Sequence, residues 1–178
     1  MKEGFVLWLT GLSGSGKTSI SLELEKRFKE RGIRYVQRLD GDVVRRELTK
    51  DLGFSKEDRD ENIRRVGFVA KLLSENGVVT ICAFISPYRD VRQEVRNKCK
   101  NFIEIFVSCP LEILIKRDPK GLYKKALNGE IKGFTGIDDP YEEPKNPEII
   151  VDTSKESLND SVEKIISYID KRGLIYTT

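Results

Sequence analysis

The sequence of 178 residues contains no histidine, one methionine and one tryptophan. Its three cysteines, Cys82, Cys99 and Cys109, lack CxxC spacing, which argues against a metal site or a disulfide framework and favours buried free thiols. No run approaches the ~20 apolar residues of a membrane span, and the apolar run at residues 5–9 lacks the flanks of a signal peptide. A net charge of only +3 with both signs interspersed gives no indication of nucleic-acid binding. We therefore expect a cytoplasmic protein without a nucleic-acid or membrane partner.

Apolar runs alternate with helix-like patterns along the chain. Strand-like runs occupy residues 5–10, 34–39, 78–84, 102–108 and 149–152. Apolar residues at helical spacing occupy residues 17–31, a stretch from Ser55 to about residue 76, and about 156–171. This alternation is typical of an α/β fold in which helices cover both faces of a parallel sheet. The length favours one domain, residues 1–178.

Residues 118–147 follow neither pattern. The segment holds four of the six prolines, several glycines, and the lysines Lys120, Lys124, Lys125 and Lys132. A loop of this length in a compact domain is usually functional, often as a lid over a binding site. We expect residues 118–147 to form a lid, and a solvated surface excursion is the alternative.

A phosphate-loop motif, G-x-x-x-x-G-K-[ST], lies between the first predicted strand and the first predicted helix. Its residues are Gly11, Leu12, Ser13, Gly14, Ser15, Gly16, Lys17 and Thr18. Such a loop surrounds phosphate groups with backbone N–H groups, and the following helix N-terminus attracts the same anion. Lys17 is then placed to reach the β- and γ-phosphates, and the Thr18 hydroxyl to bind Mg²⁺. The motif predicts nucleotide phosphate binding, and a glycine-rich turn with an incidental lysine is the alternative.

Two carboxylates, Asp40 and Asp42, follow the second predicted strand. In a parallel sheet they should lie at the same edge as the phosphate loop. There they could hold Mg²⁺ through water and accept a proton from an attacking hydroxyl. The alternative is capping of a short helix that starts near Val43, an alternative that weighs more for Asp42 than for Asp40.

Three further side chains form a candidate anion site. Arg45 follows the acidic pair, and Arg59 and Asn62 are three residues apart, hence on one face of a helix. A guanidinium can bind sulfate or phosphate oxygens through two parallel charged hydrogen bonds. Each of these residues, taken alone, also fits a solvated surface position.

Ser86 and Pro87 end the third predicted strand. Serine caps helices, and proline suits the first helical position because no N–H group is missed there. The residues alone therefore favour Ser86 as the start of a helix.

Taken in order, these motifs resemble those of adenylylsulfate kinases from Leu7 to about Thr153. The matching stretches are residues 11–18, 39–42, 45, 51–65, 84–89, 117–125 and 134–142. Many ATPases and kinases share the phosphate loop, whereas the other stretches together are highly specific. The resemblance implies that MgATP donates its γ-phosphoryl group to the 3′-hydroxyl of adenosine 5′-phosphosulfate (APS), giving 3′-phosphoadenosine 5′-phosphosulfate and ADP.

The resemblance also implies a three-layer P-loop NTPase fold with a five-stranded parallel sheet and a mobile lid. It implies a homodimer with ATP and APS as substrates and Mg²⁺ as cofactor. It leaves open whether the protein works beside a sulfate adenylyltransferase.

Site residues follow from the same resemblance. Those assigned to APS are Asp40, Arg45, Phe54, Arg59, Asn62, Ile85, Ser86 and Phe134. Those assigned to ATP are the phosphate loop, Arg117 and Lys120. Those assigned to catalysis are Lys17, Asp40, Asp42 and Ser86, and those assigned to Mg²⁺ are Thr18 and Asp40.

Two of these roles carry a physical argument. Phe54 and Phe134 resemble the rings that sandwich the acceptor adenine, which stacking stabilises. Ser86 matches a serine named in the family as a phosphoserine intermediate. Because phosphoryl transfer in P-loop kinases relies on positioning and charge neutralisation, we expect direct transfer instead.

Two other interpretations were weighed against this function. A small-metabolite or nucleoside monophosphate kinase would share Lys17, Thr18 and the lid but differ in the acceptor pocket. A nucleotide-sensing module without turnover would not need the acid pair, and residues 97–100 lack the acid of a guanine-binding Asn-Lys-x-Asp element. The APS kinase interpretation accounts for more of the motifs than either.

Overall fold

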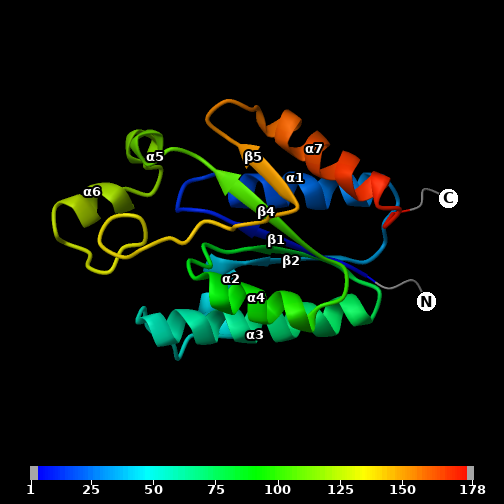
Figure 1. The fold of residues 1–178 in the computed structure, drawn as a ribbon, viewed down its shortest axis with the longest axis horizontal. Coiled ribbons are helices and arrows are strands. Elements are labelled where there is room, and N and C mark those ends of the chain that lie inside the picture. Colours follow the sequence, from blue (N-terminus) through cyan, green and yellow to red (C-terminus); the bar gives the residue numbers. More distant parts are fainter. Residues whose placement is uncertain (1–3, 176–178) are drawn as a thin grey trace.

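The computed structural model describes residues 4–175, and its elements alternate as predicted (Figure 1). The strands are β1 (Val6–Thr10), β2 (Val36–Asp40), β3 (Val79–Ala83), β4 (Phe102–Ser108) and β5 (Ile149–Asp152). The helices are α1 (Lys17–Glu30), α2 (Gly41–Glu47), α3 (Lys56–Glu75), α4 (Arg89–Lys98), α5 (Leu111–Arg117), α6 (Leu122–Leu127) and α7 (Leu158–Lys171). The predicted domain, residues 1–178, extends at both ends beyond the described residues.

The five strands form one parallel sheet in the order β2-β3-β1-β4-β5. The central strand β1 pairs with β3 and with β4, so that Leu7 lies between Ile81 and Ile103. All strands therefore end at the same edge of the sheet, and the segments that follow β1, β2 and β3 meet there. The predicted five-stranded parallel sheet is confirmed.

Helices cover both faces of the sheet (Figure 1). Helices α1 and α7 lie on one face, where the predicted buried stripe Ile20, Leu24 and Phe28 packs against alternate residues of the strands. Helices α3 and α4 lie on the other face, where Trp8 is fully buried in a second apolar cluster. The three-layer arrangement is confirmed: each helical layer buries one apolar face, and the sheet between them buries both.

Capping residues fix where two of the long helices begin. The Ser55 side chain accepts a hydrogen bond from the Asp58 backbone N–H at 3.1 Å, so α3 begins where the sequence predicted. Ser157 and Asp160 form a reciprocal capping box at α7. Helix α7 accordingly begins at Leu158, two residues later than expected.

The predicted helix start at Ser86 is wrong. Helix α4 begins at Arg89, with Tyr88 as the N-cap residue. Ser86 instead adopts a φ of 41° within residues 84–88, which we name the acceptor loop. Its side chain bonds to β1 rather than to a helix N-terminus, a contact that the local sequence does not reveal.

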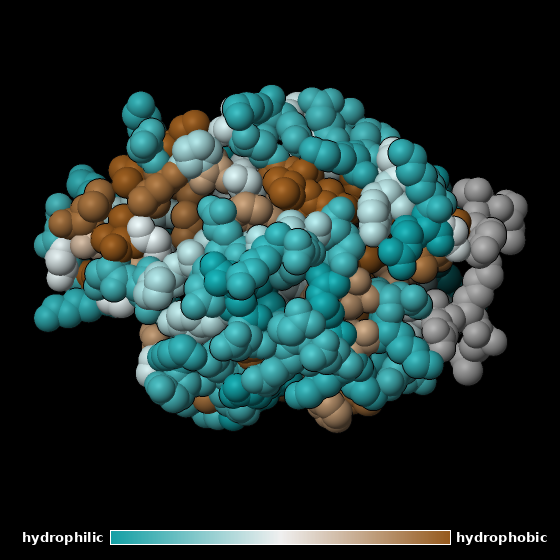
Figure 2. All heavy atoms as spheres, in the orientation of Figure 1, coloured by the Kyte–Doolittle hydropathy of each residue, from teal (hydrophilic) through white to brown (hydrophobic). Residues whose placement is uncertain are grey.

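Residues 118–147 contain α6 and a turn, which extend from one end of the sheet (Figure 1). Tyr123, Phe134 and Ile137 join Leu114 and Leu12 in a small apolar cluster beside the phosphate loop. Figure 2 shows apolar side chains gathered on the surface at this end. The segment thus has its own packing, and its role as a lid remains a prediction.

Two expectations about buried and apolar residues can be compared with the structure. All three cysteines are buried free thiols, as predicted. Burial raises the pKa of the Cys82 thiol well above its usual value, which keeps this thiol protonated. Within residues 4–175, no helix combines the length and the apolar character needed to cross a membrane.

Candidate functional site

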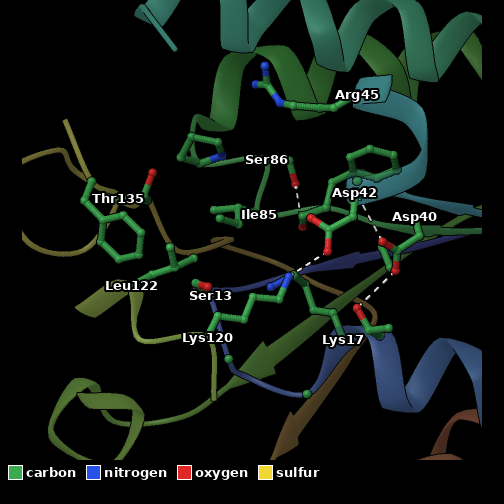
Figure 3. Close-up of a pocket in the computed structure, with 18 of the residues that line it drawn as sticks. Ser13, Lys17, Asp40, Asp42, Arg45, Ile85, Ser86, Lys120, Leu122 and Thr135 are labelled. Atoms are coloured by element: carbon green, nitrogen blue, oxygen red, sulfur yellow. Dashed lines mark hydrogen bonds and ion pairs between the residues drawn. The ribbon is translucent and has the colours of Figure 1, made fainter. Parts of the chain in front are cut away.

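A cavity of about 540 Å³ lies at the carboxyl edge of the sheet (Figure 3). The phosphate loop, the segment after β2, the start of α3, the acceptor loop and residues 118–135 line it. The predicted site residues that line it are Ser13, Gly14, Gly16, Lys17, Thr18, Asp40, Asp42, Arg45, Phe54, Arg59, Asn62, Ile85, Ser86, Lys120 and Phe134. Gly11, Leu12, Ser15 and Arg117 do not line it. One cavity therefore brings the predicted donor and acceptor residues together.

The phosphate loop needs glycine at two positions for different reasons. A Cβ at Gly11 would lie 2.4 Å from the carbonyl oxygen of Val107, so a side chain there would clash with β4. Gly16 is the N-cap residue of α1 and has a φ of 103°, a conformation that other residues rarely adopt. These glycines let the loop turn sharply from β1 into α1, as an anion-binding loop requires.

Lys17 lies inside the loop and is buried. Its Nζ donates hydrogen bonds to the carbonyl oxygens of Gly11 at 2.8 Å and Leu12 at 2.7 Å. Burial lowers the pKa of Lys17 to about 7, although the nearby Asp40 carboxylate opposes the shift. An anion such as a phosphate that binds beside this buried amine would stabilise its protonated form.

Asp40 connects the segment after β2 to the phosphate loop. Its Oδ1 accepts a hydrogen bond from the Asp42 backbone N–H at 3.1 Å, so Asp40, and not Asp42, caps α2. Its Oδ2 accepts hydrogen bonds from the Thr18 hydroxyl at 3.0 Å and from Arg38 at 3.1 Å. The capping alternative therefore applies to Asp40, yet the same carboxylate also faces the loop.

The oxygen atoms of Thr18 and Asp40 fit a magnesium ion. Mg²⁺ prefers oxygen ligands and is usually held by one or two carboxylates, waters and substrate phosphates. Within residues 4–175, no three histidine, cysteine, aspartate or glutamate side chains cluster as an all-protein metal site. The chain thus offers the partial ligand set that a nucleotide-bound Mg²⁺ uses.

Asp42, the second residue of α2, does not cap the helix and instead faces residues 118–147, which we call the lid segment after their predicted role. Its Oδ2 accepts an ion-paired hydrogen bond from Lys120 Nζ at 2.6 Å, across the cavity (Figure 3). Both side chains are more than half exposed, and exposed ion pairs of this kind contribute little to stability. The pair can therefore open when a charged ligand competes for Lys120.

Arg45 lies on the far side of the cavity from the phosphate loop (Figure 3). Its guanidinium donates to the carbonyl oxygen of Gly53 at 2.9 Å and lies 4.5 Å above the centre of the Phe54 ring. Phe54 is 70% exposed and lines the cavity, so its ring is accessible to a ligand there. Burial, together with the positive charge of Arg59, lowers the pKa of Arg45. Two arginines that repel each other favour an anion between them.

Arg59 joins the start of α3 to residues 133–139. It donates hydrogen bonds to Asp139 Oδ2 at 2.5 Å, to Thr135 Oγ1 at 2.7 Å and to the carbonyl oxygen of Gly133. These bonds place Phe134, between two of the partners, at the cavity wall. Asn62, the predicted neighbour of Arg59, accepts a bond from the Thr49 hydroxyl at 2.8 Å.

The Ser86 hydroxyl is directed into the protein. It is 2% exposed, accepts a hydrogen bond from Trp8 Nε1 at 3.1 Å, and lies 3.5 Å from the carbonyl oxygen of Phe84. The hydroxyl therefore accepts a hydrogen bond from one protein group and faces another protein group as its acceptor. Ser86 serves as a structural anchor of the acceptor loop in this conformation.

Several contacts at the site were not predicted from the sequence. The Tyr123 hydroxyl donates to the Ser13 carbonyl oxygen at 2.8 Å, and Tyr88 donates to Asp139 at 3.0 Å. Arg117 donates to the Thr153 carbonyl oxygen at 2.7 Å and so lies beside the phosphate loop rather than in the cavity. The partners are 36 to 110 residues apart, and no local pattern in the sequence could have paired them.

Comparison with known proteins identifies the family. The family model for adenylylsulphate kinase matches residues 3–152. An adenylyl-sulfate kinase from Halothermothrix orenii is 56% identical over 174 residues, which cover 98% of this chain and 94% of that protein. A "Probable bifunctional SAT/APS kinase 2" from Sorangium cellulosum is 52% identical over 97% of this chain and 29% of its own length.

Solved structures agree with the sequence relatives. The APS kinase of Mycobacterium tuberculosis, in complex with AMPPNP and APS, is 41% identical and superposes with a TM-score of 0.91. The match covers 96% of this chain and 99% of that one. With its P-loop cavity and these matches over nearly its whole length, the chain belongs to the adenylylsulphate kinase family.

Proposed function

We propose that the chain works as an adenylyl-sulfate kinase by holding MgATP and APS end to end in the cavity. The γ-phosphoryl group passes to the 3′-hydroxyl of APS, and the products are 3′-phosphoadenosine 5′-phosphosulfate and ADP. The observation that carries the proposal is a single cavity lined on one side by the phosphate loop and on the other by Arg45, Arg59 and two aromatic rings. Relatives with the same activity in their names support it over nearly the full chain.

The donor side binds the triphosphate. Backbone N–H groups of the phosphate loop and the N-terminus of α1 face the β- and γ-phosphates. Lys17 exchanges its carbonyl partners for phosphate oxygens, and Lys120 leaves Asp42 to add a second positive charge. Thr18 and Asp40 hold Mg²⁺, which supplies charge neutralisation at the phosphate oxygens when it is bound. Catalysis on this side consists of positioning and charge stabilisation.

The acceptor side binds APS through charge and stacking. The 70% exposed ring of Phe54 and the ring of Phe134 offer two faces for the adenine. Arg45 and Arg59 carry the positive charge that the phosphosulfate needs, and Asn62 offers an amide beside them. A small sugar or shikimate-like acceptor would leave both rings and one arginine unused.

Asp40 orients the reacting hydroxyl. Both of its carboxylate oxygens already accept hydrogen bonds, from Asp42 N–H and from Thr18 and Arg38. A carboxylate has about four acceptor sites, so one site remains for the 3′-hydroxyl, and the Thr18 hydroxyl frees a second for an Mg²⁺-bound water when it turns to the metal. We expect direct, in-line transfer, because Ser86 is 2% exposed and its hydroxyl contacts the Trp8 N–H and the Phe84 carbonyl oxygen.

The partners and the assembly remain predictions. The Sorangium relative combines SAT, an abbreviation of sulfate adenylyltransferase, with APS kinase in one chain, which supports a sulfate adenylyltransferase as functional partner. The exposed side chains of Phe68 and Leu72, one helical turn apart on α3, are compatible with the predicted homodimer. The cytoplasmic location is likewise inferred from the sequence.

An acceptor panel tests the proposal. Purified protein receives ATP and Mg²⁺ with APS, AMP or shikimate, and ADP is followed with a coupled assay. We expect ADP to form with APS at least a hundredfold faster than with AMP, because AMP lacks the sulfate that Arg45 and Arg59 would bind. Equal rates with AMP, or no ADP with APS, would refute the proposed acceptor.

A variant in the same panel tests direct transfer. Ser86→Ala removes the hydroxyl that accepts from the fully buried Trp8 N–H, which should lower stability by about 1–3 kcal/mol. We expect turnover with APS to remain within about tenfold of the wild type, because no covalent intermediate forms on Ser86. A protein that binds both substrates normally but has lost all turnover would contradict direct transfer.

A further inference from the structure

Residues 139–142, near the end of the segment 118–147, connect this segment to β1 before the phosphate loop and to the acceptor loop. The Tyr141 ring stacks on Phe106, with centroids 6.1 Å apart, and its hydroxyl lies 2.9 Å from Thr10 Oγ1. Thr10, the last residue of β1, directly precedes the phosphate loop. The Thr10 hydroxyl donates in turn to the carbonyl oxygen of Ile85 in the acceptor loop, at 2.7 Å. Two consecutive hydrogen bonds thus connect all three parts.

The number of protons sets the direction of these hydrogen bonds. A threonine hydroxyl has one hydrogen, and a carbonyl oxygen can only accept. Because Thr10 gives its hydrogen to Ile85, Tyr141 must donate to Thr10. Burial raises the pKa of Tyr141 to about 12, so the phenol keeps the proton that this donation needs.

The acceptor loop requires such restraint. Ser86 has a φ of 41°, a conformation that is unfavourable for a residue with a Cβ. Arg92, only 2% exposed, donates to the carbonyl oxygen of Ser86 at 2.5 Å and to that of Glu142 at 2.7 Å. Arg92 therefore fastens residues 139–142 to the acceptor loop at a second point, beside the Tyr141 contact.

We propose that Tyr141 is a positioning residue for the acceptor substrate. Acting through Thr10, its hydroxyl sets where Ile85 lies in the cavity wall, next to Ser86 (Figure 3). Tyr141 itself does not line the cavity, so it acts on APS only through these neighbours. The inference rests on the proposed function, because Ile85 matters in this way only if APS binds against the acceptor loop.

The Tyr141→Phe variant removes the hydroxyl and keeps the ring that stacks on Phe106. The Thr10 hydroxyl then loses its donor and can turn toward the carbonyl oxygen of Ser86, which already lies 3.5 Å away. We expect the KM for APS to rise about three- to tenfold, the range for loss of one neutral hydrogen bond. We expect the KM for ATP and kcat to stay close to wild type and the melting temperature to fall by only a few degrees.

Tyr35→Phe is the matched control, because Tyr35 is 58% exposed and precedes β2 at the opposite edge of the sheet. Steady-state kinetics give both KM values and kcat. Fluorescence of Trp8, the single tryptophan and a hydrogen-bond partner of Ser86, gives the Kd for APS without turnover. A KM for APS within twofold of wild type in Tyr141→Phe, or an equal rise in the KM for ATP, would overturn the inference.

A double-mutant cycle tests whether Tyr141 acts through Thr10. If it does, adding Tyr141→Phe to Thr10→Val should not raise the KM for APS further. Additive effects would show that Tyr141 acts by another route. Should Thr10→Val fail to fold, Thr10→Ser retains the hydroxyl and must keep a wild-type KM for APS. A rise in Thr10→Ser equal to that in Tyr141→Phe would also contradict the inference.

The wild-type control separates this inference from the proposed function. A wild-type protein that forms no ADP with APS rejects the function itself. A wild-type protein that turns over APS, with a Tyr141→Phe variant indistinguishable from it, rejects only the role of Tyr141.

Discussion

Lys17 is the side chain whose protonation couples nucleotide binding to pH. In the free protein, burial lowers the pKa of its ammonium group to about 7. A bound triphosphate places negative charge beside the amine and raises the pKa again. The bound form therefore holds a proton that the free form lacks at alkaline pH, and ATP should bind most tightly below pH 7, where Lys17 is already charged.

This coupling predicts proton uptake on ATP binding. At pH 8 roughly nine-tenths of free Lys17 is neutral, so binding should take up about 0.9 proton per site, falling to about 0.1 at pH 6. Isothermal titration calorimetry in buffers of different ionisation enthalpy measures this number. Lys17→Arg, which stays protonated, should show almost no uptake at either pH. Equal uptake by the wild type at pH 6 and pH 8 would contradict the assigned role of Lys17.

Residues with partners nearby in the sequence could be predicted, and residues with remote partners could not. The phosphate-loop motif and the acid pair identified Lys17 and Asp40 because their chemistry depends on local spacing. The choice between Asp40 and Asp42 as helix cap needed the backbone geometry of α2. Ser86 was assigned to a helix start because its actual partner, Trp8, is 78 residues away.

The strands were predicted more accurately than the short helices. Strands β4 and β5 have the expected bounds, since each is a short run rich in apolar and β-branched residues. Helix α4 was expected to begin at Ser86 but begins at Arg89, and its ten residues are mostly charged or polar, so the sequence marks its start poorly. It is stabilised by close packing on α3, where a Cβ at Gly67 would lie only 2.5 Å from Val95. The sequence shows only the two buried valines, Val91 and Val95, at helical spacing, and the close approach to Gly67 cannot be read from them.

The lid segment is attached to the body of the protein at both ends. Near its start Lys120 pairs with Asp42 through an exposed contact, and near its end Asp139 pairs with the largely buried Arg59. The exposed Lys120–Asp42 pair can open easily, whereas buried Tyr123 holds α6 to the carbonyl oxygen of Ser13, so a closing movement has to break or carry the Tyr123 contact. Closure over bound nucleotides would exclude water and limit wasteful ATP hydrolysis.

Limited proteolysis tests whether this segment closes. Lys124, Lys125 and Lys132 are exposed sites for trypsin in and after α6. We expect AMPPNP and APS together to slow cleavage there about tenfold or more, because cleavage requires an opened segment. Cleavage at Lys98, at the opposite edge of the sheet, serves as the reference and should not change. Unchanged cleavage at all of these sites would remove the lid hypothesis.

The whole molecule places three functional segments at one edge of a single sheet. The phosphate loop follows β1, Asp40 ends β2, and the acceptor loop follows β3. Because these strands are neighbours in the order β2-β3-β1, the donor and acceptor sites share one cavity. This arrangement follows the general rule that α/β sheets bind ligands at the carboxyl ends of their strands.

A crystal structure with AMPPNP, Mg²⁺ and APS tests the central claim most directly. We predict that APS lies between Phe54 and Phe134, with its phosphosulfate at Arg45 and Arg59 and its 3′-hydroxyl beside Asp40. The triphosphate should occupy the phosphate loop, with Lys17 at its γ-phosphate. A complex in which APS is bound elsewhere, while the space beside Phe54 and Arg59 stays empty, would contradict the account.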